Sequence, residues 1–233
     1  MVEKDAIERV SSGVAGLDSL VKGGLPKWST ILVSGTPGTG KTILSLQFLV
    51  NGALESNEKG VYISLEEDVT RIKKYMNATF GWPMEELEKK KKLLMVKSDL
   101  YDFEMFKSLI ESNVEKIDAQ RIVIDPLTVI SLFFEKPLDI RRSLLDLDRI
   151  LKKLNCTTLL TCEIPEGSNS ISSFGIEEFT CDGIIILSYY PGLYPRGITI
   201  RKMRATNHDT DVHPFEIKYK KGITVFHSEK MFK

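Results

Sequence analysis

The chain has 233 residues, of which 42% are hydrophobic and 27% are charged. A chain of this size and composition is not expected to be disordered, and it is long enough for a single α/β domain, which we expect to span residues 1–233. Thirty-two Lys and Arg residues balance thirty-two Asp and Glu residues, so the overall charge does not indicate a binder of nucleic acids or anionic membranes.

The first ten residues, MVEKDAIERV, are charged, and no apolar run has the length needed to span a bilayer. We therefore expect a cytoplasmic protein without a membrane partner. The cysteines Cys156, Cys162 and Cys181 form no CxxC motif and no metal-ligand spacing with the histidines. We expect them to be buried thiols.

Apolar, β-branched runs alternate with helical patterns through most of the chain. The expected strands are ILVSG (31–35), VYISL (61–65), LLMV (93–96), RIVID (121–125) and TTLLT (157–161). Helices are expected from about residue 41, up to residue 75, over 103–117 and near 138–154. Strands alone follow, at 183–190, 197–204, 212–220 and 222–226. This order predicts a mainly parallel sheet with helices on both faces and an antiparallel C-terminal extension.

The segment GTPGTGKT, residues 35–42, satisfies the pattern G-x-x-x-x-G-K-[ST] between an apolar strand and an amphipathic helix. Glycines let the backbone turn so that its N–H groups converge on phosphate oxygens. Lys41 would bind the β- and γ-phosphates of ATP, and Thr42 would ligate Mg²⁺. The expected nucleotide-binding residues of this segment are Gly35, Thr36, Pro37, Gly38, Thr39, Gly40, Lys41, Thr42 and Ile43.

Two other strands end in carboxylates. Asp125 ends RIVID, at the edge where α/β sheets bind ligands, and as a Walker-B residue it would hold Mg²⁺ through water. The alternative is a turn-forming aspartate before Pro126. Glu66 and Glu67 follow VYISL and could orient or deprotonate an attacking water. The alternative is a surface pair at the start of the next helix.

The segment RKMRATNHD (201–209) continues an alternating strand pattern into cations. Because side chains alternate across a strand, Ile198, Ile200, Lys202 and Arg204 are predicted to share one face. Two cations at the end of that face suggest an anionic ligand, and the alternative is a solvated basic strand end.

The segment GTPGTGKT is the pattern of a P-loop. Together with six other segments, it carries a resemblance to a known protein family that extends from about residue 10 to residue 226. They are SSGVAGLDSLVKGGLP (11–26), SLEE (64–67), RIVIDP (121–126), TCE (161–163), GIEEFTCDGIIIL (175–187) and KMRATNH (202–208). The chain resembles the KaiC-like branch of the RecA superfamily. The resemblance implies a RecA-like fold, a hexamer with ATP at subunit interfaces, and catalytic roles for Lys41, Glu66 and Glu67.

The same resemblance implies that Lys202 and Arg204 act as catalytic residues that reach the γ-phosphate bound by the neighbouring subunit. It implies that Glu163 occupies a sensor position near the nucleotide. His208 would lie near a nucleotide or the subunit boundary, although a lone histidine is more often structural.

Some residues depart from the family's pattern. The clock protein KaiC carries two such domains, whereas this chain has one. The Ser-Thr pair that the second KaiC domain phosphorylates aligns with Glu178 and Phe179, so autophosphorylation there is excluded. The resemblance also places Phe179 over the attacking water. Pro126 replaces a commoner serine, and Glu163 stands where recombinases generally use glutamine.

Three functions are weighed. A slow, Mg²⁺-dependent regulatory or signalling ATPase, with a possible protein client, is favoured. The rival is an ATP-dependent, single-stranded DNA-binding protein similar to RadA paralogues, active in recombination or repair. Against it, residues 164–195 contain no Lys or Arg, and the acidic residues Glu166, Glu177, Glu178 and Asp182 would repel phosphate. Phe133 and Phe134 fit a core or interface better than a base-stacking platform. A non-hydrolysing nucleotide-binding scaffold is disfavoured by Glu66 and Glu67.

Overall fold

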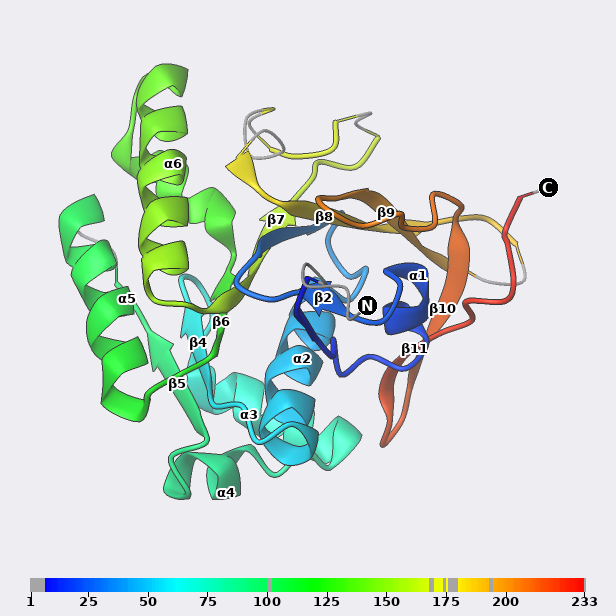
Figure 1. Ribbon diagram of the computed structural model, residues 1–233, viewed down its shortest axis with the longest axis horizontal. Coiled ribbons are helices and arrows are strands. Elements are labelled where there is room, and N and C mark those ends of the chain that lie inside the picture. Colours follow the sequence, from blue (N-terminus) through cyan, green and yellow to red (C-terminus); the bar gives the residue numbers. More distant parts are fainter. Residues whose placement is uncertain are drawn as a thin grey trace, which may run out of the picture.

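The computed structural model describes residues 7–99, 102–167, 170–173, 175, 180–192 and 195–232. Glu178 and Phe179 lie outside these residues. A nine-stranded mixed sheet forms the centre of the molecule (Figure 1), with the strand order β11-β10-β9-β8-β3-β7-β6-β4-β5. Its strands are β3 (Thr30–Gly35), β4 (Gly60–Ser64), β5 (Leu93–Lys97), β6 (Arg121–Asp125), β7 (Thr157–Glu163), β8 (Gly183–Tyr189), β9 (Arg196–Met203), β10 (His213–Lys218) and β11 (Gly222–Val225).

The six strands from β8 to β5 in this order are parallel, whereas β9, β10 and β11 run antiparallel to their neighbours. The predicted architecture, a parallel sheet with an antiparallel C-terminal extension, is therefore confirmed. The central strand β3 connects through α2 (Lys41–Glu55) to β4, with β7 and β6 between them. This reversal of strand order beside β3 leaves a crevice at the carboxyl ends of the strands, where α/β sheets bind ligands.

Helices cover both faces of the sheet. One hydrophobic cluster joins α2, α3 (Val69–Phe80) and α4 (Met84–Lys89) to the sheet, and α1 (Leu17–Leu20) belongs to the same cluster. A second cluster joins α5 (Phe103–Ile117), η1 (Leu127–Phe133) and α6 (Pro137–Lys153) to the opposite face. Figure 1 shows α5 and α6 together on one side and α2 on the other. Because each helix presents one apolar stripe, both faces of the parallel strands are buried.

Local sequence signals explain where the helices begin. The carboxylates of Asp68 and Asp102 accept hydrogen bonds from backbone N–H groups in the first turns of α3 and α5. Pro137 opens α6. Proline has no backbone N–H, and this is tolerated in the first turn because an N–H there has no partner within the helix. The apolar period predicted near residues 138–154 is confirmed, since one side of α6 is buried against the sheet at Ile140, Ser143, Leu144, Leu147 and Leu151.

Short elements escaped the sequence analysis. They are α1, α4, η1 and a two-stranded ribbon of β1 (Arg9–Val10) and β2 (Leu25–Pro26). β1 and β2 have two residues each, and α1, α4 and η1 have seven residues or fewer, which is too short for a hydrophobic period to be recognised. The ribbon and α1 pack on the α2 side of the sheet through residues such as Val10, Leu17 and Leu25.

The prediction that Ile198, Ile200, Lys202 and Arg204 share a face is wrong. In the pairing of β8 with β9, Ile185 faces Ile200 but the next residue, Ile184, faces Lys202. Arg201 is therefore an extra, bulged residue that inverts the alternation. Met203 joins Ile198 and Ile200 in the core on the α2 side, Lys202 lies on the opposite face, and Arg204 follows the end of the strand.

Three other expectations can be compared with the packing. Cys156, Cys162 and Cys181 are buried, as predicted. Phe133 and Phe134 are partly buried against the α5–α6 core, and the ring of Phe134 contacts that of Phe103 edge-on. Over the residues that the structure describes, no helix has both the length and the apolar character needed to cross a membrane.

Candidate nucleotide-binding site

The carboxyl ends of four adjacent strands position the site. The loop from Gly35 to Gly40 leaves β3, Glu66 and Glu67 follow β4, Asp125 ends β6, and Glu163 ends β7. Gly35 pairs with Glu163 across β3 and β7, and Ser64 pairs with Asp125 across β4 and β6. Parallel pairing therefore brings residues that are far apart in sequence to one edge of the sheet.

The loop requires glycine at several positions. Gly38 and Gly40 have φ angles of 78° and 108°, which only glycine adopts readily. At Gly35, a Cβ atom would lie 2.4 Å from the carbonyl oxygen of Leu187. The loop is also held by hydrogen bonds from the Thr39 hydroxyl to the Thr36 carbonyl (2.8 Å) and from the Tyr189 hydroxyl to the Gly38 carbonyl (2.6 Å).

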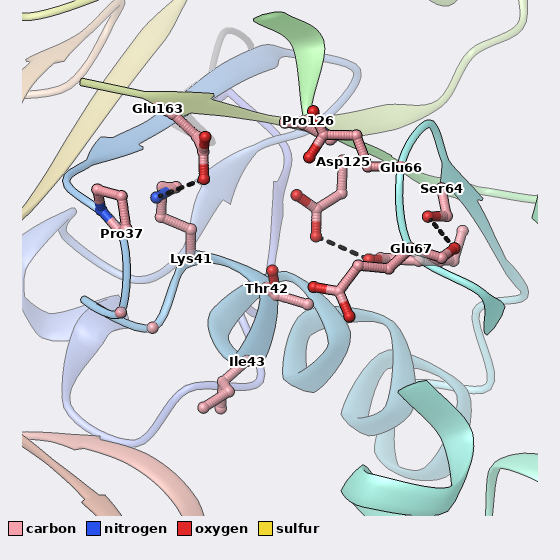
Figure 2. A pocket seen from close by; sticks show the side chains of 13 residues that line it. Pro37, Lys41, Thr42, Ile43, Ser64, Glu66, Glu67, Asp125, Pro126 and Glu163 are labelled. Carbon is pink, nitrogen blue, oxygen red and sulfur yellow. Dashed lines mark hydrogen bonds and ion pairs between the residues drawn. The ribbon is translucent and has the colours of Figure 1, made fainter. Parts of the chain in front are cut away.

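Lys41, the first residue of α2, is buried beneath the loop. Its Nζ donates hydrogen bonds to the carbonyl oxygens of Gly35 (2.9 Å) and Thr36 (3.1 Å) and lies 3.9 Å from Oε1 of Glu163 (Figure 2). Burial lowers the pKa of Lys41, while the negative charges of Glu163 and Asp125 oppose that shift. The ammonium group is thus held in place by acceptors that a phosphate could replace.

Asp125 is a buried carboxylate fixed by two hydroxyl groups. The Tyr62 hydroxyl donates to its Oδ2 at 2.7 Å, and the Thr161 hydroxyl donates to its Oδ1. Burial and the adjacent Asp125 charge raise the pKa of Tyr62, so its hydroxyl remains a donor. Asp125 therefore does more than form a turn before Pro126: it is oriented at the edge of the site.

Glu66 and Glu67 form the exposed rim of the site. The backbone carbonyl of Glu67 accepts a hydrogen bond from the Ser64 hydroxyl at 2.6 Å. Figure 2 shows the Glu66 and Glu67 side chains beside Asp125 and Thr42. Burial, and then the negative charges of Glu163, Asp125 and Glu67, raise the pKa of Glu66. A carboxylate with a raised pKa is better suited to accept a proton near neutral pH.

A cavity of about 370 Å³ collects these groups. It is lined by Pro37, Gly38, Gly40, Lys41, Thr42, Ile43, Tyr62, Ser64, Glu66, Glu67, Asp125, Pro126 and Glu163. Gly35, Thr36 and Thr39 belong to the same loop and hold it through the contacts given above. Among the described residues that line the cavity, Lys41 is the only cation. The lining therefore carries four carboxylates and one ammonium group, which is too little positive charge to neutralise a bound triphosphate.

Lys202 and Arg204 do not contribute to this cavity. The Lys202 ammonium donates to the Cys181 carbonyl (2.6 Å), and Arg204 pairs with Asp182 at 3.0 Å. The Asp182 amide in turn donates to the carbonyl of Thr30, the first residue of β3. The P-loop leaves the other end of β3, so five steps of about 3.3 Å place it roughly 17 Å from these cations.

His208 also lies away from the cavity. It is half-buried, and its Nδ1 is 2.9 Å from the carbonyl oxygen of Asp209, on the segment between β9 and β10. Within one chain, therefore, the predicted site residues fall into two groups. The P-loop residues and the acidic residues are assembled, and the three residues of the KMRATNH segment lie at the other end of the sheet.

The sequence analysis missed Tyr62 and Thr161, which fix Asp125. Both carried a signal. A tyrosine inside a buried strand needs a partner for its hydroxyl, and Thr161 lies two residues before Glu163, on the same side of its strand. Neither signal identifies Asp125 as the acceptor, because that contact depends on the adjacency of β4, β6 and β7.

A glycine-rich turn between a buried strand and a helix, facing an oriented aspartate on a nearby strand, defines a P-loop protein with a RecA-like fold. The sequence profile of a family described as "ATPase: KaiC" matches residues 10–230. This chain belongs to that KaiC ATPase family.

Related proteins agree with this assignment. A UPF0273 protein of Thermotoga maritima is 36% identical, over 96% of this chain and 98% of its own length. The circadian clock oscillator protein KaiC of Nostoc is 35% identical over 95% of this chain, which covers only 45% of that longer protein. The crystal structure of a KaiC-like protein from Pyrococcus horikoshii superposes with a TM-score of 0.86 at 39% identity, covering 95% of this chain and all of the other.

Proposed function

We propose that the protein hydrolyses ATP slowly, with Mg²⁺, at the interfaces between identical subunits of a ring, and that it serves as a regulatory or signalling ATPase acting on a protein client. One observation carries the proposal: the phosphate-binding cavity and the cations of the KMRATNH segment lie at opposite ends of one sheet. Two subunits placed head to tail would bring the two groups together.

The residues of the cavity suit ATP and Mg²⁺. Both oxygens of Asp125 accept one hydrogen bond from a hydroxyl group, and each keeps a lone pair for a metal-bound water. Thr42 follows Lys41 at the start of α2 and would supply a hydroxyl ligand. When bound there, Mg²⁺ would neutralise part of the phosphate charge.

The roles of the other residues follow from their positions. Lys41 exchanges its carbonyl acceptors for phosphate oxygens, and the backbone N–H groups of the glycine loop bind the rest of the triphosphate. Glu66 and Glu67 orient a water and accept its proton. Lys202 and Arg204 of the neighbouring subunit stabilise the negative charge that develops on the transferring phosphoryl group.

Mixing two inactive variants tests the shared site. Lys41→Ala removes the ammonium group from the cavity, and Arg204→Ala removes a cation from the far end of the sheet. In a ring of mixed subunits, some interfaces combine an intact P-loop with an intact Arg204. We expect hydrolysis to recover when the two proteins are mixed and allowed to exchange subunits. Each variant alone should be nearly inactive.

A matched control is Arg201→Ala, which removes an exposed cation of the same strand. It should retain activity alone and should not be needed for recovery. If mixing restores no activity although native mass measurements show mixed rings, the cations do not act across the interface. If the protein remains a monomer with ATP and Mg²⁺ and still hydrolyses ATP at its full rate, the ring itself is refuted.

The DNA-binding alternative gains no specific support. Phe133 and Phe134, the candidates for base stacking, are partly buried against the core of α5 and α6. A scaffold without hydrolysis is disfavoured by the presence of Glu66 and Glu67 at the cavity. Equal phosphate release by the wild type and by a Glu66→Gln, Glu67→Gln double variant would favour the scaffold.

A further inference from the structure

Three potential metal ligands meet on the segment that follows the KMRATNH motif. A carboxylate oxygen of Asp209, one of Asp211 and a ring nitrogen of His213 all lie within 4.8 Å of one another. They come from alternate residues, at the turn into β10. The side chains of Asp209 and Asp211 are 29% and 44% exposed, so the group opens to solvent on its acidic side.

The buried histidine distinguishes this group from an ordinary acidic cluster. His213 is 1% exposed, and its Nδ1 lies 2.6 Å from the carbonyl oxygen of Glu229. A carbonyl only accepts, so Nδ1 carries the proton and Nε2 is left with its lone pair in the neutral ring. Nε2 is buried and faces Oδ1 of Asp209 at 3.2 Å, and it has no hydrogen-bond partner among the residues that the structure describes.

We infer that Asp209, Asp211 and His213 bind a divalent transition-metal ion of the Zn²⁺ class. A lone pair that faces a carboxylate oxygen needs a cation between them, unless the imidazole is itself protonated. Zn²⁺ binds nitrogen and oxygen at about 2.0–2.2 Å, so tetrahedral ligands lie about 3.3–3.5 Å apart, close to the observed 3.2 Å separation of Asp209 Oδ1 and His213 Nε2.

The surroundings provide the support that such a ligand needs. A backbone carbonyl that accepts the second ring N–H fixes the tautomer and orientation of metal-binding histidines, as the Glu229 carbonyl does here. The Asp211 amide donates to Asp209 Oδ1 at 2.8 Å, which fixes that carboxylate while a lone pair remains. Imidazole together with carboxylates selects Zn²⁺-like ions over Mg²⁺ and Ca²⁺, which prefer oxygen ligands alone.

One cation already competes for the site. The Lys230 ammonium lies 2.5 Å from Oδ2 of Asp211 and is 56% exposed. The metal would displace it from Asp211. The bound ion would then link the segment carrying Arg204 and His208 to β10 and, through the Glu229 carbonyl, to the C-terminal segment.

A Zn²⁺ titration of the full chain tests the site. The protein is stripped with a chelator, kept in excess Mg²⁺ and ADP to occupy the nucleotide cavity, and titrated against a chromogenic zinc indicator. We expect one Zn²⁺ per chain. Asp209→Asn should weaken binding about tenfold or more, because it removes a charged ligand with little change in shape. Lys230→Ala should tighten binding, since the competing ammonium is lost. The exposed His227, changed to Gln, is the matched control and should bind as the wild type does.

A spectroscopic measurement on the wild type tests the metal site even if a variant folds poorly. Co²⁺ bound by the wild type should show the visible absorption of a four-coordinate site, and Asp211→Asn should reduce it. The inference is overturned if no Zn²⁺ binds, if Asp209→Asn binds as tightly as the wild type, or if binding is lost on Asp125→Asn instead. Any of these results would leave the group as an imidazolium–carboxylate pair or place the ion in the nucleotide cavity. None depends on ATP hydrolysis, so the outcome is separate from that of the proposed function.

Discussion

The two ends of the central sheet differ in how much of a site each assembles. At the carboxyl end of β3, the glycine loop, Lys41 and four carboxylates surround one cavity within a single chain. At the amino end, the Lys202 ammonium donates to the Cys181 carbonyl, and Arg204 pairs with the Asp182 carboxylate. The first end has an excess of negative charge, and the second presents cations.

Under the proposed function, this difference divides the catalytic residues between two subunits. A cavity that contained all the cations would hydrolyse ATP in any isolated chain. In the proposed ring, the cations lie roughly 17 Å away along β3 in their own chain, and a neighbouring subunit supplies the ones that balance the charge on the transferring phosphoryl group. On this proposal hydrolysis depends on assembly, and four substitutions can test the two ends separately.

The largest effect is expected at the amino end. Arg204→Ala should lower kcat for ATP hydrolysis about 10³-fold, the lower range for an arginine supplied across an interface, and should leave ATP binding nearly unchanged. Steady-state phosphate release and nucleotide titration measure the two quantities. Arg201→Ala is the control of equal charge. A similar loss of kcat in both variants would show that general charge, rather than the position of Arg204, matters.

The next effect concerns the acidic rim. Glu66→Gln should lower kcat about 10²-fold or more, because the amide cannot accept a proton from water. Glu67→Gln alone should cost less, since the raised pKa of Glu66 makes it the better base. Single-turnover hydrolysis with saturating ATP measures the step directly. A larger loss for Glu67→Gln would reverse the assignment.

A smaller effect is expected behind the cavity. Tyr62→Phe removes the hydroxyl that donates to Asp125 and should raise the Mg²⁺ concentration needed for half-maximal hydrolysis about tenfold. Thr161→Ser keeps the second donor to Asp125 and should change little, whereas Thr161→Val should resemble Tyr62→Phe. If Tyr62→Phe lowers the rate equally at all Mg²⁺ concentrations, the hydroxyl does not act through the metal ligand.

The smallest effect is a shift with pH. The negative charge of Glu163 is among the causes that raise the pKa of Glu66. Glu163→Gln removes that charge, favours the Glu66 carboxylate and lowers its pKa. The acidic limb of kcat/KM should therefore move to lower pH. The nearby exposed Glu166, changed to Gln, is the control. A shift to higher pH, or an equal shift in the control, would contradict the coupling of Glu163 to Glu66.

The sequence was sufficient to predict features that depend on contiguous residues. The P-loop, the strand that ends in Asp125 and the period of α6 each involve a run of neighbours, and the structure agrees with them. The order of elements likewise predicted the parallel sheet and its antiparallel extension, because βαβ units and successive strands favour these arrangements.

Features that depend on how strands pair could not be predicted from runs of neighbouring residues. The hydroxyl groups of Tyr62 and Thr161 meet at Asp125 because β4, β6 and β7 are neighbours, which no local pattern specifies. The prediction of the sheet face on which Lys202 lies was wrong because it also depends on strand pairing. Strict alternation holds only where pairing is regular, and the extra residue Arg201 is visible only from the register between β8 and β9.

The bulge at Arg201 also allows the direction of the strand end to change without a change in the hydrophobic core. Without that residue, regular alternation would still turn Lys202 away from the α2 side and Met203 toward it, so the hydrophobic core would tolerate its deletion. What would change is the local bend and twist, and with them the direction in which Arg204 projects. Insertion or loss of one residue at this point is therefore a route by which the direction of Arg204 can change while the hydrophobic interior of the chain stays the same.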